Sequence, residues 1–600
     1  MPDAMELSEA RPAPQLAGCE VRGLTRVWFR RGGPQPAGMP LVARVLAARG
    51  LADAATARAF LEPSLSQLHD PSLIPDLDKA ADRLLAAARG GEAIVIYGDY
   101  DVDGISATAI LFHTLRAVAP AAAVTTYVPH RLEEGYGLNS EAVRELARLG
   151  AKVIVSVDCG ITAVAPALVS REVGVDLIIT DHHNPPETMA ALPAAYAVVH
   201  PRRPDSAYPF GDLCGAGVAF KLAWRLCTRA CASARVTEEL RTLLLELLAL
   251  TSLGVIADVV PLVGENRVIA AKGLARIKHS AIPGLRALVE ASGLGTDKVE
   301  AEDVGFRLAP RLNACGRMGH AREAVELLTA ADGPRATAIA EDLTRLNDER
   351  RVTERAIFEQ ALGMAQAAGM TRPDRRAIVL SHPDWHAGVV GIVCSRLVER
   401  FHRPAILLAR HDGVCHGSGR SIDRFNLHAG LQRCAAHLTT FGGHDMAAGL
   451  KLPASGLDAF ADAFIAVANE AIPPEALIGT CGHDGPVSVG ELGIDAVTQL
   501  RRLGPFGRSN PDVRLVLEGV RVAQRPETFG NGNKHLCVRV SDARAGLGGA
   551  VLRLTGWNWA ERISSVPPGA TIDALIAPKI NRWNGRVTVE ADLIDLRPLG

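Results

Sequence analysis

The chain has 600 residues, of which 48% are hydrophobic and 22% are charged. This balance is that of folded globular proteins, so it excludes a wholly disordered, collagen-like or coiled-coil chain. At roughly 150 residues per domain, the length predicts about four domains. The formal net charge is −1, yet residues 501–600 hold 15 Lys and Arg against 9 Asp and Glu, which indicates a basic C-terminal region.

The sequence shows no pattern of secretion or membrane insertion. The first residues, MPDAMELSEARPAP, include acidic side chains and no apolar run, unlike a secretory signal. The longest strongly apolar run, Leu247 to Ala257, is shorter than the roughly 18 residues of a membrane span. The 11 cysteines include no Cys-x-x-Cys pair, as expected of reduced thiols. We therefore expect a cytoplasmic protein without a membrane partner.

Residues 1–80 form a Pro- and Gly-containing N-terminal extension in which we recognise no chemistry. From Ala93 onward, apolar runs, acidic loops and amphipathic helices alternate, which is typical of βαβ units and a parallel sheet. We expect strands at Ala93–Tyr97, Val153–Val157 and Leu177–Thr180. A helix is expected from about Ile105 to Val118, and another after a cap at Asn139 or Ser140.

The second half of the chain predicts three further parts. A charge-rich, Pro-poor stretch predicts a long helix over residues 326–370. Strand and helix patterns return over residues 371–480, which predicts a second α/β domain. Short, turn-bounded strands over residues 481–600 predict a small all-β barrel. The predicted fold class is therefore α/β, with two lobes joined by a long helix and a C-terminal barrel.

Acidic and histidine side chains follow the predicted strands where each strand ends. Open parallel sheets build their sites beyond the carboxyl ends of their strands, so these side chains are expected to converge. Carboxylates with imidazole and no thiolate favour Mn²⁺ or Mg²⁺ over structural zinc. The candidates are Asp99, Asp101 and Asp103, which alternate in an expected extended loop, with Asp158, Asp181, His182, His183 and Asp258.

So many carboxylates in one cleft repel one another unless cations neutralise them. Two metal ions about 3.5–4 Å apart are a recurrent solution in phosphoester hydrolysis, and Asp158 is the candidate bridge between them. His183 is a candidate acid or substrate anchor. The alternative for any single carboxylate is a helix cap or a solvated loop residue, but four ordered clusters argue against that interpretation for the set.

These motifs resemble those of the DHH phosphoesterase superfamily. The matching stretches are GDYDVDG at 98–104, VDCG at 157–160, DHH at 181–183 and ADVVP at 257–261. The resemblance implies metal ligands at Asp99, Asp101, Asp103, Asp158, His182 and Asp258, with Asp181 and His183 completing the third motif. Among these, Asp101, Asp103, Asp158, His182 and His183 are the expected catalytic residues.

Further stretches resemble the RecJ family of bacterial exonucleases within that superfamily. They are APRLNACGRM at 309–318, GVVGIVCSRLVERF at 388–401, GSGRS at 417–421 and FGGHDMAAG at 441–449. The resemblance implies a DHH catalytic domain over 81–325, a connecting helix over 326–370, a DHHA1-like substrate-binding domain over 371–480 and an OB-like nucleic-acid-binding domain over 481–600. It also implies hydrolysis of single-stranded DNA from the 5′ end to 5′-mononucleotides, in DNA repair and recombination.

The substrate is expected to be held by arginines, because the planar guanidinium matches phosphate oxygens. The resemblance implies that Arg131, Ser418 and Arg420 bind the terminal 5′-phosphate. Arg311, Asn313 and Arg317 are further candidates, although a single arginine can equally form a surface salt bridge. His444 either contacts the DNA backbone or stabilises its turn. In the tail, Trp557, Trp559 and Trp583 either stack bases or fill the barrel core.

Two other functions remain open at this point. One is a DHH phosphodiesterase that acts on cyclic dinucleotides or very short oligonucleotides, and the other is a non-catalytic replication scaffold. The C-terminal barrel and long helix favour a polymeric substrate over the first, and the complete acidic set disfavours the second. The expected partners are single-stranded DNA, a single-stranded-DNA-binding protein and a repair helicase, and the expected oligomeric state is a monomer.

Overall fold

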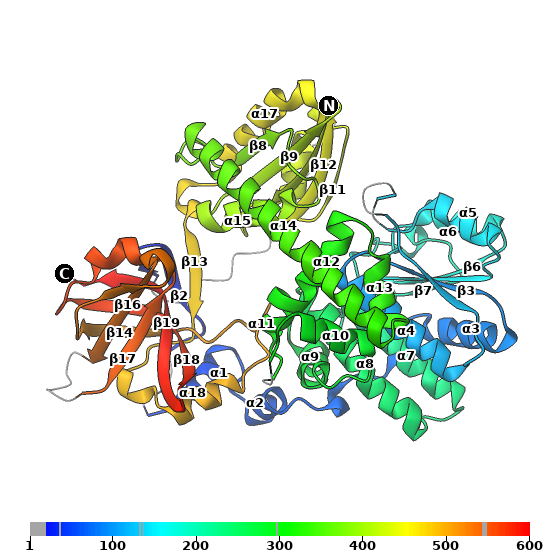
Figure 1. The fold of residues 1–600 in the computed structure, drawn as a ribbon, viewed down its shortest axis with the longest axis horizontal. Helices are drawn as coiled ribbons and strands as arrows, with labels where there is room; N and C mark the ends of the chain where they lie inside the picture. The colour runs from blue at the N-terminus through cyan, green and yellow to red at the C-terminus, as the bar shows by residue number, and fades with distance from the viewer. Residues whose placement is uncertain are drawn as a thin grey trace. The chain divides into compact units, whose positions relative to one another are not determined.

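The computed structural model describes residues 20–34, 36, 38–130, 134–135, 137–295, 298–542 and 549–599. It divides into two compact units (Figure 1). The parallel-sheet unit contains residues 62–350 together with residues 504–511. The barrel unit contains the chain up to Leu61, residues 351–503, and the chain from Asp512 onward.

The parallel-sheet unit is built on the predicted parallel sheet, which has five strands in the order β4-β3-β5-β6-β7. The three strands placed from the sequence are β3, β5 and β6, whereas β4 and β7 were not predicted. In the register, Gly98 lies beside Val157, and Val157 lies beside Thr180, so neighbouring strands end at one level. The residues that follow these strands therefore emerge at a single edge. The strands are β3 (Ile94–Gly98), β4 (Val124–Tyr127), β5 (Val153–Val157), β6 (Asp176–Thr180) and β7 (Ala197–Val199).

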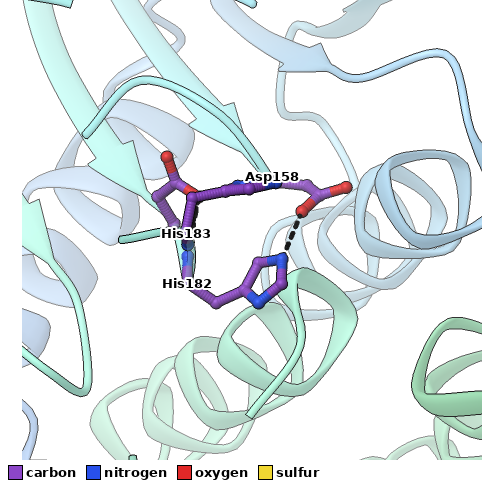
Figure 2. Close-up of side chains that lie close together, drawn as sticks. Asp158, His182 and His183 are labelled. Carbon is purple, nitrogen blue, oxygen red and sulfur yellow. Dashed lines mark hydrogen bonds and ion pairs between the residues drawn. The ribbon is translucent and has the colours of Figure 1, made fainter. Parts of the chain in front are cut away.

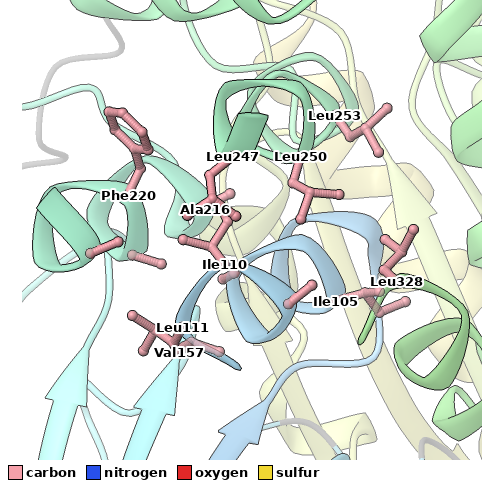
Figure 3. Close-up of a cluster of buried hydrophobic side chains, with 14 of the residues drawn as sticks. Ile105, Ile110, Leu111, Val157, Ala216, Phe220, Leu247, Leu250, Leu253 and Leu328 are labelled. Carbon is pink, nitrogen blue, oxygen red and sulfur yellow. The ribbon is translucent and has the colours of Figure 1, made fainter. Parts of the chain in front are cut away.

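Side chains that alternate along the strands enter two cores, because successive strand residues point to opposite faces. Ile94, Ile96 and Val155 pack with one set of helices, whereas Val95 and Ile154 pack with the other. Figure 3 shows part of the first core, with side chains from α4, α7 and α8. The helices of the first set are α3 (Leu77–Gly90), α4 (Val102–Val118), α7 (Gly215–Ala230) and α8 (Glu238–Ala257), and those of the second are α5 (Ser140–Arg148) and α6 (Val164–Glu172).

Helix α4 begins three residues earlier than predicted, and this changes the acidic loop. Asp101 is the N-cap, and its Oδ1 accepts hydrogen bonds from the backbone N–H groups of Asp103 and Gly104 at 2.9 and 3.1 Å. A carboxylate at this position stabilises the first helical turn. Asp103 therefore lies inside the helix, and the expectation of one extended loop through all three carboxylates is wrong.

Helix α8 is long and apolar enough to cross a membrane by length and composition, but half of its apolar window is buried inside the structure. Leu247, Leu250 and Leu253 belong to the core shown in Figure 3. Thr251 and Ser252 are also buried, and both hydroxyls donate hydrogen bonds to backbone carbonyls of the same helix. This is the environment of a central helix in a folded core.

Further helices complete the parallel-sheet unit and lead out of it. They are α9 (Gly264–Ile277), α10 (Pro283–Ala291), α11 (Ala301–Asp303), α12 (Ala309–Met318) and α13 (Arg322–Thr329). The predicted long helix is α14 (Gly333–Ala367), and the division between the two units falls within it.

The barrel unit contains a second α/β fold, as predicted. Its sheet has the order β11-β12-β10-β9-β8, in which only β8 and β9 are parallel. The strands are β8 (Ile378–His382), β9 (Ala405–His411), β10 (Val414–Arg420), β11 (Thr440–Gly443) and β12 (Ala447–Pro453), and the helices are α15 (Val390–Phe401), α16 (Leu427–Arg433) and α17 (Leu457–Ala471).

The tail forms the predicted all-β barrel. Six strands have the order β14-β18-β19-β17-β16-β15, and an additional pairing of β14 with β16 closes the sheet. Closure leaves fewer unpaired strand edges. The strands are β14 (Leu515–Val522), β15 (Glu527–Phe529), β16 (His535–Asp542), β17 (Val551–Gly556), β18 (Thr571–Trp583) and β19 (Arg586–Pro598).

Part of the N-terminal extension also belongs to the barrel unit. A small sheet joins β1 (Val21–Arg22), β2 (Arg26–Arg30) and β13 (Gly479–His483), and the helices α1 (Leu41–Ala48), α2 (Ala54–Leu61) and α18 (Ile494–Arg501) lie in the same unit. The domain boundaries expected from the sequence stay predictions.

Asp595 of β19 joins the two ends of the chain. Its buried carboxylate accepts hydrogen bonds from the backbone N–H groups of Thr25 and Arg26 and, at 2.9 Å, from Nε1 of Trp28. The Trp28 side chain is itself buried against Leu575 and Cys481. The carboxylate therefore satisfies three donors from a segment more than 500 residues away in the sequence.

We predict that Asp595→Ala destabilises the barrel unit by about 3 kcal/mol, because a buried donor left without an acceptor costs about 1–3 kcal/mol. Differential scanning calorimetry should show an unfolding transition at lower temperature. The exposed Asp462→Ala on α17 is the control and should leave the transition in place. Equal behaviour of the two variants would contradict this account of Asp595.

Candidate metal centre

All eight acidic and histidine residues singled out from the sequence come together at one edge of the parallel sheet. Asp99 follows β3, Asp158 follows β5, and the Asp181–His183 segment follows β6. Asp258 caps the C-terminus of α8. Potential ligand atoms lie within 4.8 Å of one another in three groups, which are Asp99 with Asp101 and Asp158, Asp103 with His182 and Asp258, and Asp158 with Asp181, His182 and His183.

His182 lies at the middle of this cluster. Its Nε2 is 3.1 Å from Oδ1 of Asp158, 3.7 Å from Oδ2 of Asp258 and 3.8 Å from Oδ2 of Asp103. Figure 2 shows the imidazole of His182 pointing toward the carboxylate of Asp158. One imidazole thus faces three carboxylates that come from a strand end and two helices.

Asp103 is held by the N-terminus of a second helix. Its two carboxylate oxygens accept hydrogen bonds from the backbone N–H groups of Gly215 and Ala216 in the first turn of α7, at 2.6 and 2.9 Å. The positive end of the helix dipole stabilises a carboxylate here. Gly254 of α8 allows this arrangement, because a Cβ atom at that position would lie 2.2 Å from Oδ1 of Asp103.

Asp158 adopts an uncommon backbone conformation, with φ of 63°. Such conformations cost free energy in residues other than glycine and concentrate at functional sites. Gly215 makes room for the side chain, since a Cβ atom there would lie 2.6 Å from Cβ of Asp158. The fold therefore places this carboxylate against the start of α7 at the expense of local backbone strain.

Asp181 positions the two histidines. It accepts hydrogen bonds from the backbone N–H groups of His182 and His183 and from Nδ1 of His183, all on Oδ1, while Oδ2 accepts from the N–H of Ile161. Although burial opposes it, the bond from His183 holds the pKa of Asp181 well below its usual range. Asp181 thus fixes the orientation of this segment as a permanent anion.

Two residues that the sequence interpretation missed hold the same segment from behind. Arg202 donates to the carbonyl oxygen of His182, and Nε2 of His200 lies 2.7 Å from the carbonyl oxygen of His183. Both come from the segment HPRR, directly after β7. Their position after the next strand of the sheet is the only sequence signal that could have indicated them.

The electrostatics of the cluster oppose its own ionisation. Burial, followed by the neighbouring carboxylates, raises the pKa of Asp158 well above its usual range. Burial also raises the pKa of Asp103, and burial together with Asp103 and Asp101 raises the pKa of Asp258 to about 8. Burial lowers the pKa of His182 to about 4, so its imidazole is neutral at pH 7. The site lacks enough positive charge for its carboxylates, which a bound cation would supply.

His183 differs from its neighbour. Burial opposes its protonation, but the hydrogen bond and charge of Asp181 prevail and raise the pKa of His183 to about 9. The side chain is 30% exposed, compared with 11% for His182. A neutral imidazole suited to metal binding and a cationic imidazole suited to an anion therefore lie side by side, with ring centroids 4.4 Å apart.

The residues fit hard divalent cations. Five carboxylates and one neutral imidazole are an oxygen-rich donor set typical of Mn²⁺ and Mg²⁺. Nε2 of His182 is buried and makes no hydrogen bond within the described part of the chain, although it faces the carboxylates. A cation among these atoms would satisfy the imidazole lone pair and offset the repulsion between the carboxylates.

The predicted substrate residues of the parallel-sheet unit lie on α12. Oδ1 of Asn313 accepts a hydrogen bond from the backbone N–H of Val102, so Asn313 supports the start of α4. The guanidinium of Arg311 donates to Oγ1 of Thr344 and to the carbonyl oxygen of Arg307. Arg317 is half-buried near the end of the helix. Arg131 lies outside the described residues.

Ser418 and Arg420 lie on β10 in the barrel unit, beside the first turn of α15. The Arg420 guanidinium donates to Oγ of Ser418 at 3.3 Å and to the carbonyl oxygen of Gly419 at 2.8 Å. Gly391 of α15 allows the close approach, because a Cβ atom there would lie 2.8 Å from Oγ of Ser418. His444 is exposed in the turn between β11 and β12, where its N–H donates to Ala447.

The three tail tryptophans have different environments. Trp557 is half exposed, and its ring centroid lies 4.8 Å from that of His535 and 6.0 Å from that of Phe529. Nζ of Lys579 is 5.5 Å from the Trp557 ring. Trp583 is also exposed, whereas Trp559 is buried and therefore matches the core-filling alternative.

Comparisons with known proteins agree with this geometry. Three family models match, namely the N-terminal domain of the DHH family over residues 93–251, the DHHA1 domain over 374–470 and the RecJ OB domain over 483–595. A crystal structure of RecJ from Thermus thermophilus in complex with Mn²⁺ superposes with a TM-score of 0.77 at 33% identity, over 93% of this chain and 75% of that one. A Mg²⁺ complex from the same organism gives a TM-score of 0.71.

Curated relatives carry the same name. A single-stranded-DNA-specific exonuclease RecJ of Bacillus subtilis is 38% identical over 91% of this chain, which spans 66% of that relative's length. One from Dickeya dadantii is 37% identical over 90% of this chain and 93% of its own length. With a complete acidic set at the strand ends and 37–38% identity to these relatives over about 90% of its length, the chain belongs to the RecJ family of DHH proteins.

Proposed function

We propose that this chain is a metal-dependent exonuclease that hydrolyses single-stranded DNA from its 5′ end and releases 5′-mononucleotides. The observation that carries the proposal is the convergence of six candidate ligands in two sets around the Asp158–His182 contact of 3.1 Å. Membership of a family of single-stranded-DNA-specific exonucleases supports the substrate class. The separate 5′-end site described below supports the direction.

The proposed ligands would divide between two Mn²⁺ or Mg²⁺ ions. Asp99, Asp101 and Asp158 would hold one ion, and Asp103, His182 and Asp258 would hold the other, with Asp158 close enough to His182 to serve both. Two such ions lower the pKa of a bound water and neutralise charge on the phosphoryl group and the leaving oxygen during in-line displacement. The helix termini at Asp101 and Asp103 keep these carboxylates in place before substrate binds.

His183 supplies a proton donor beside the ligands. Asp181 holds Nδ1 at 2.7 Å, and this contact orients the cationic ring so that it would donate a hydrogen bond to a phosphate oxygen of the substrate. This bond would anchor the scissile phosphate or protonate the departing oxygen, the two roles expected from the sequence. Because the base of the cluster is buried and His183 is partly exposed, substrate would approach from the His183 side.

The 5′-end site consists of Ser418, Arg420 and the first turn of α15. The Ser418 hydroxyl and the Arg420 guanidinium, which lie beside the start of α15, form a set that suits a phosphate monoester. Arg131 is proposed to complete it, and Arg311, Asn313, Arg317 and His444 are proposed to contact the following nucleotides. A site for a terminal phosphate explains why digestion would start at the 5′ end.

The barrel would hold the more distant nucleotides. Trp557, His535 and Phe529 form an exposed aromatic group next to Lys579, and base stacking on such groups tolerates any sequence. This surface favours a polymer over a cyclic dinucleotide. We further propose a cytoplasmic monomer in DNA repair and recombination, with a single-stranded-DNA-binding protein and a repair helicase as partners.

Asp158→Asn should lower the rate of nucleotide release by more than about a hundred-fold, because changes even to residues behind metal ligands cost about 10–100-fold. Strands labelled at the 5′ or the 3′ end, and matching blunt duplex, are digested with Mn²⁺, with Mg²⁺ or with EDTA. Early release of the 5′ label from single strands, abolished by EDTA, is the expected result.

The exposed Glu290→Gln on α10 removes the same charge and should leave that rate unchanged. Hydrolysis of dinucleotides without digestion of long strands would instead support the short-substrate phosphodiesterase. Binding of single strands without turnover of either substrate would support the scaffold.

Arg420→Ala should remove the preference for a 5′-phosphorylated strand over a 5′-hydroxyl strand. The expected loss of kcat/KM is about tenfold or more on the phosphorylated strand alone, since hydrogen bonds to charged groups contribute about 1.5–3 kcal/mol. Arg433→Ala on α16, which loses an exposed ion pair with Glu470, is the matched control. An equal loss on both strands would contradict a 5′-phosphate contact.

Trp557→Ala should weaken binding of long strands about tenfold, because base–aromatic stacking contributes about 1–3 kcal/mol per base. Strands too short to reach the barrel should bind as before. Fluorescence anisotropy in EDTA measures both, and Val551→Ala, an exposed apolar residue of the same barrel, is the control. Unchanged affinity for long strands would show that this aromatic group does not bind DNA.

A further inference from the structure

Residues 504–511 connect α18 to β14, yet they pack with the parallel-sheet unit while both flanks belong to the barrel unit. Arg267 of α9 anchors the start of the segment. Its guanidinium is 2% exposed and donates to the carbonyl oxygen of Gly504 at 2.9 Å and to that of Pro505 at 3.5 Å. A buried arginine on two backbone carbonyls fixes this segment to the unit that holds the metal centre.

The rest of the segment is a tight hairpin. Gly507 and Asn510 exchange two backbone hydrogen bonds, and the buried Asn510 side chain donates to Pro505 at 2.8 Å. The turn is attached to the chain after the fourth motif, because the N–H of Leu262 donates to the carbonyl oxygen of Arg508 at 2.8 Å. The backbone of Arg508 is therefore held from both sides.

The side chain of Arg508 is exposed and lies beside the fourth motif. Its Nη1 is 3.5 Å from the carbonyl oxygen of Val259, the residue that follows Asp258. A cation is thus presented at the rim of an otherwise acidic site.

We propose that Arg508 is a substrate-binding residue of the metal centre, and that its guanidinium binds a backbone phosphate of the DNA next to the scissile linkage. The inference rests on the proposed function. Its basis is position, because an exposed planar guanidinium on a fixed backbone lies beside the proposed metal ligand Asp258, and such a group suits a backbone phosphate. The structural alternative is that the guanidinium only supports the chain at Val259, and the binding experiment separates these two roles.

The test is a double-mutant cycle that combines a substitution in the protein with a neutralised phosphate in the DNA. The full chain and its Arg508→Ala variant are titrated by fluorescence anisotropy, in EDTA to prevent hydrolysis, against 5′-phosphorylated single strands. Each strand carries one neutral methylphosphonate at a different position among the first four linkages. The variant should bind the unmodified strand about tenfold more weakly than the wild type does. When the methylphosphonate replaces the one phosphate that Arg508 contacts, the variant and the wild type should bind that strand with the same affinity.

The salt dependence gives a second readout. Loss of one phosphate contact should lower the slope of log Kd against log salt by about 0.7, the value for one contact on a single strand. Arg508→Lys should restore this slope because it keeps the charge, but should recover only part of the affinity because the planar fork is lost.

Arg241→Ala is the matched control. It removes an exposed arginine from the first turn of α8, about 25 Å along that helix from Asp258 at 1.5 Å per residue. It should change neither affinity nor slope. Equal losses at all four linkages, or an Arg508→Ala variant that binds like the wild type, would overturn the inference. Failure of the wild type itself to digest single strands would instead overturn the proposed function.

Discussion

Repulsion between buried carboxylates is the constraint on which the site depends. Asp103, Asp158 and Asp258 are brought within reach of one imidazole in a place where burial and their mutual charge raise all three pKa values. A fold without rigid support would relieve this repulsion by moving the side chains apart. Here the aligned strand ends and the helix termini oppose that movement, so without a cation the carboxylates are neutralised by protonation, whereas a bound divalent cation would keep them ionised.

The support for each carboxylate is different, and together they explain the surrounding fold. Asp101 caps its own helix, α4. Asp103 accepts hydrogen bonds from backbone N–H groups in the first turn of α7, so this turn must lie close to the sheet. Gly254 brings the apolar helix α8 against Asp103, and this requires a helix hydrophobic enough to be buried in the core. Asp158 lies beside the imidazole of His182 and is held there in a strained backbone conformation with positive φ.

The parallel sheet and the eight metal-site residues could be predicted from sequence because both follow from local patterns: apolar runs define strands, and parallel strands end at one edge. The start of α4 was predicted at the wrong residue because the alternating carboxylates were interpreted as an extended loop, whereas Asp101 is the N-cap of the helix. Arg202, Gly254 and Arg508 were missed for another reason. Their roles depend on contacts between segments from 20 to about 250 residues apart, which no local pattern reports.

The chain passes between the two units at four points: after Leu61, within the continuous helix α14, and on each side of the hairpin at 504–511. In the proposed function, the unit that holds the metal ligands differs from the unit that holds the 5′-end site and the aromatic surface. Removing one nucleotide at a time requires the strand to advance while it stays bound. In this proposal, stacking on Trp557 and charge from Lys579 would allow such sliding because neither reads a base, whereas the proposed metal ligands must not move. Because these two requirements fall on separate units, the proposed DNA-binding surface of the barrel could adapt to a moving strand while the proposed catalytic carboxylates stay fixed.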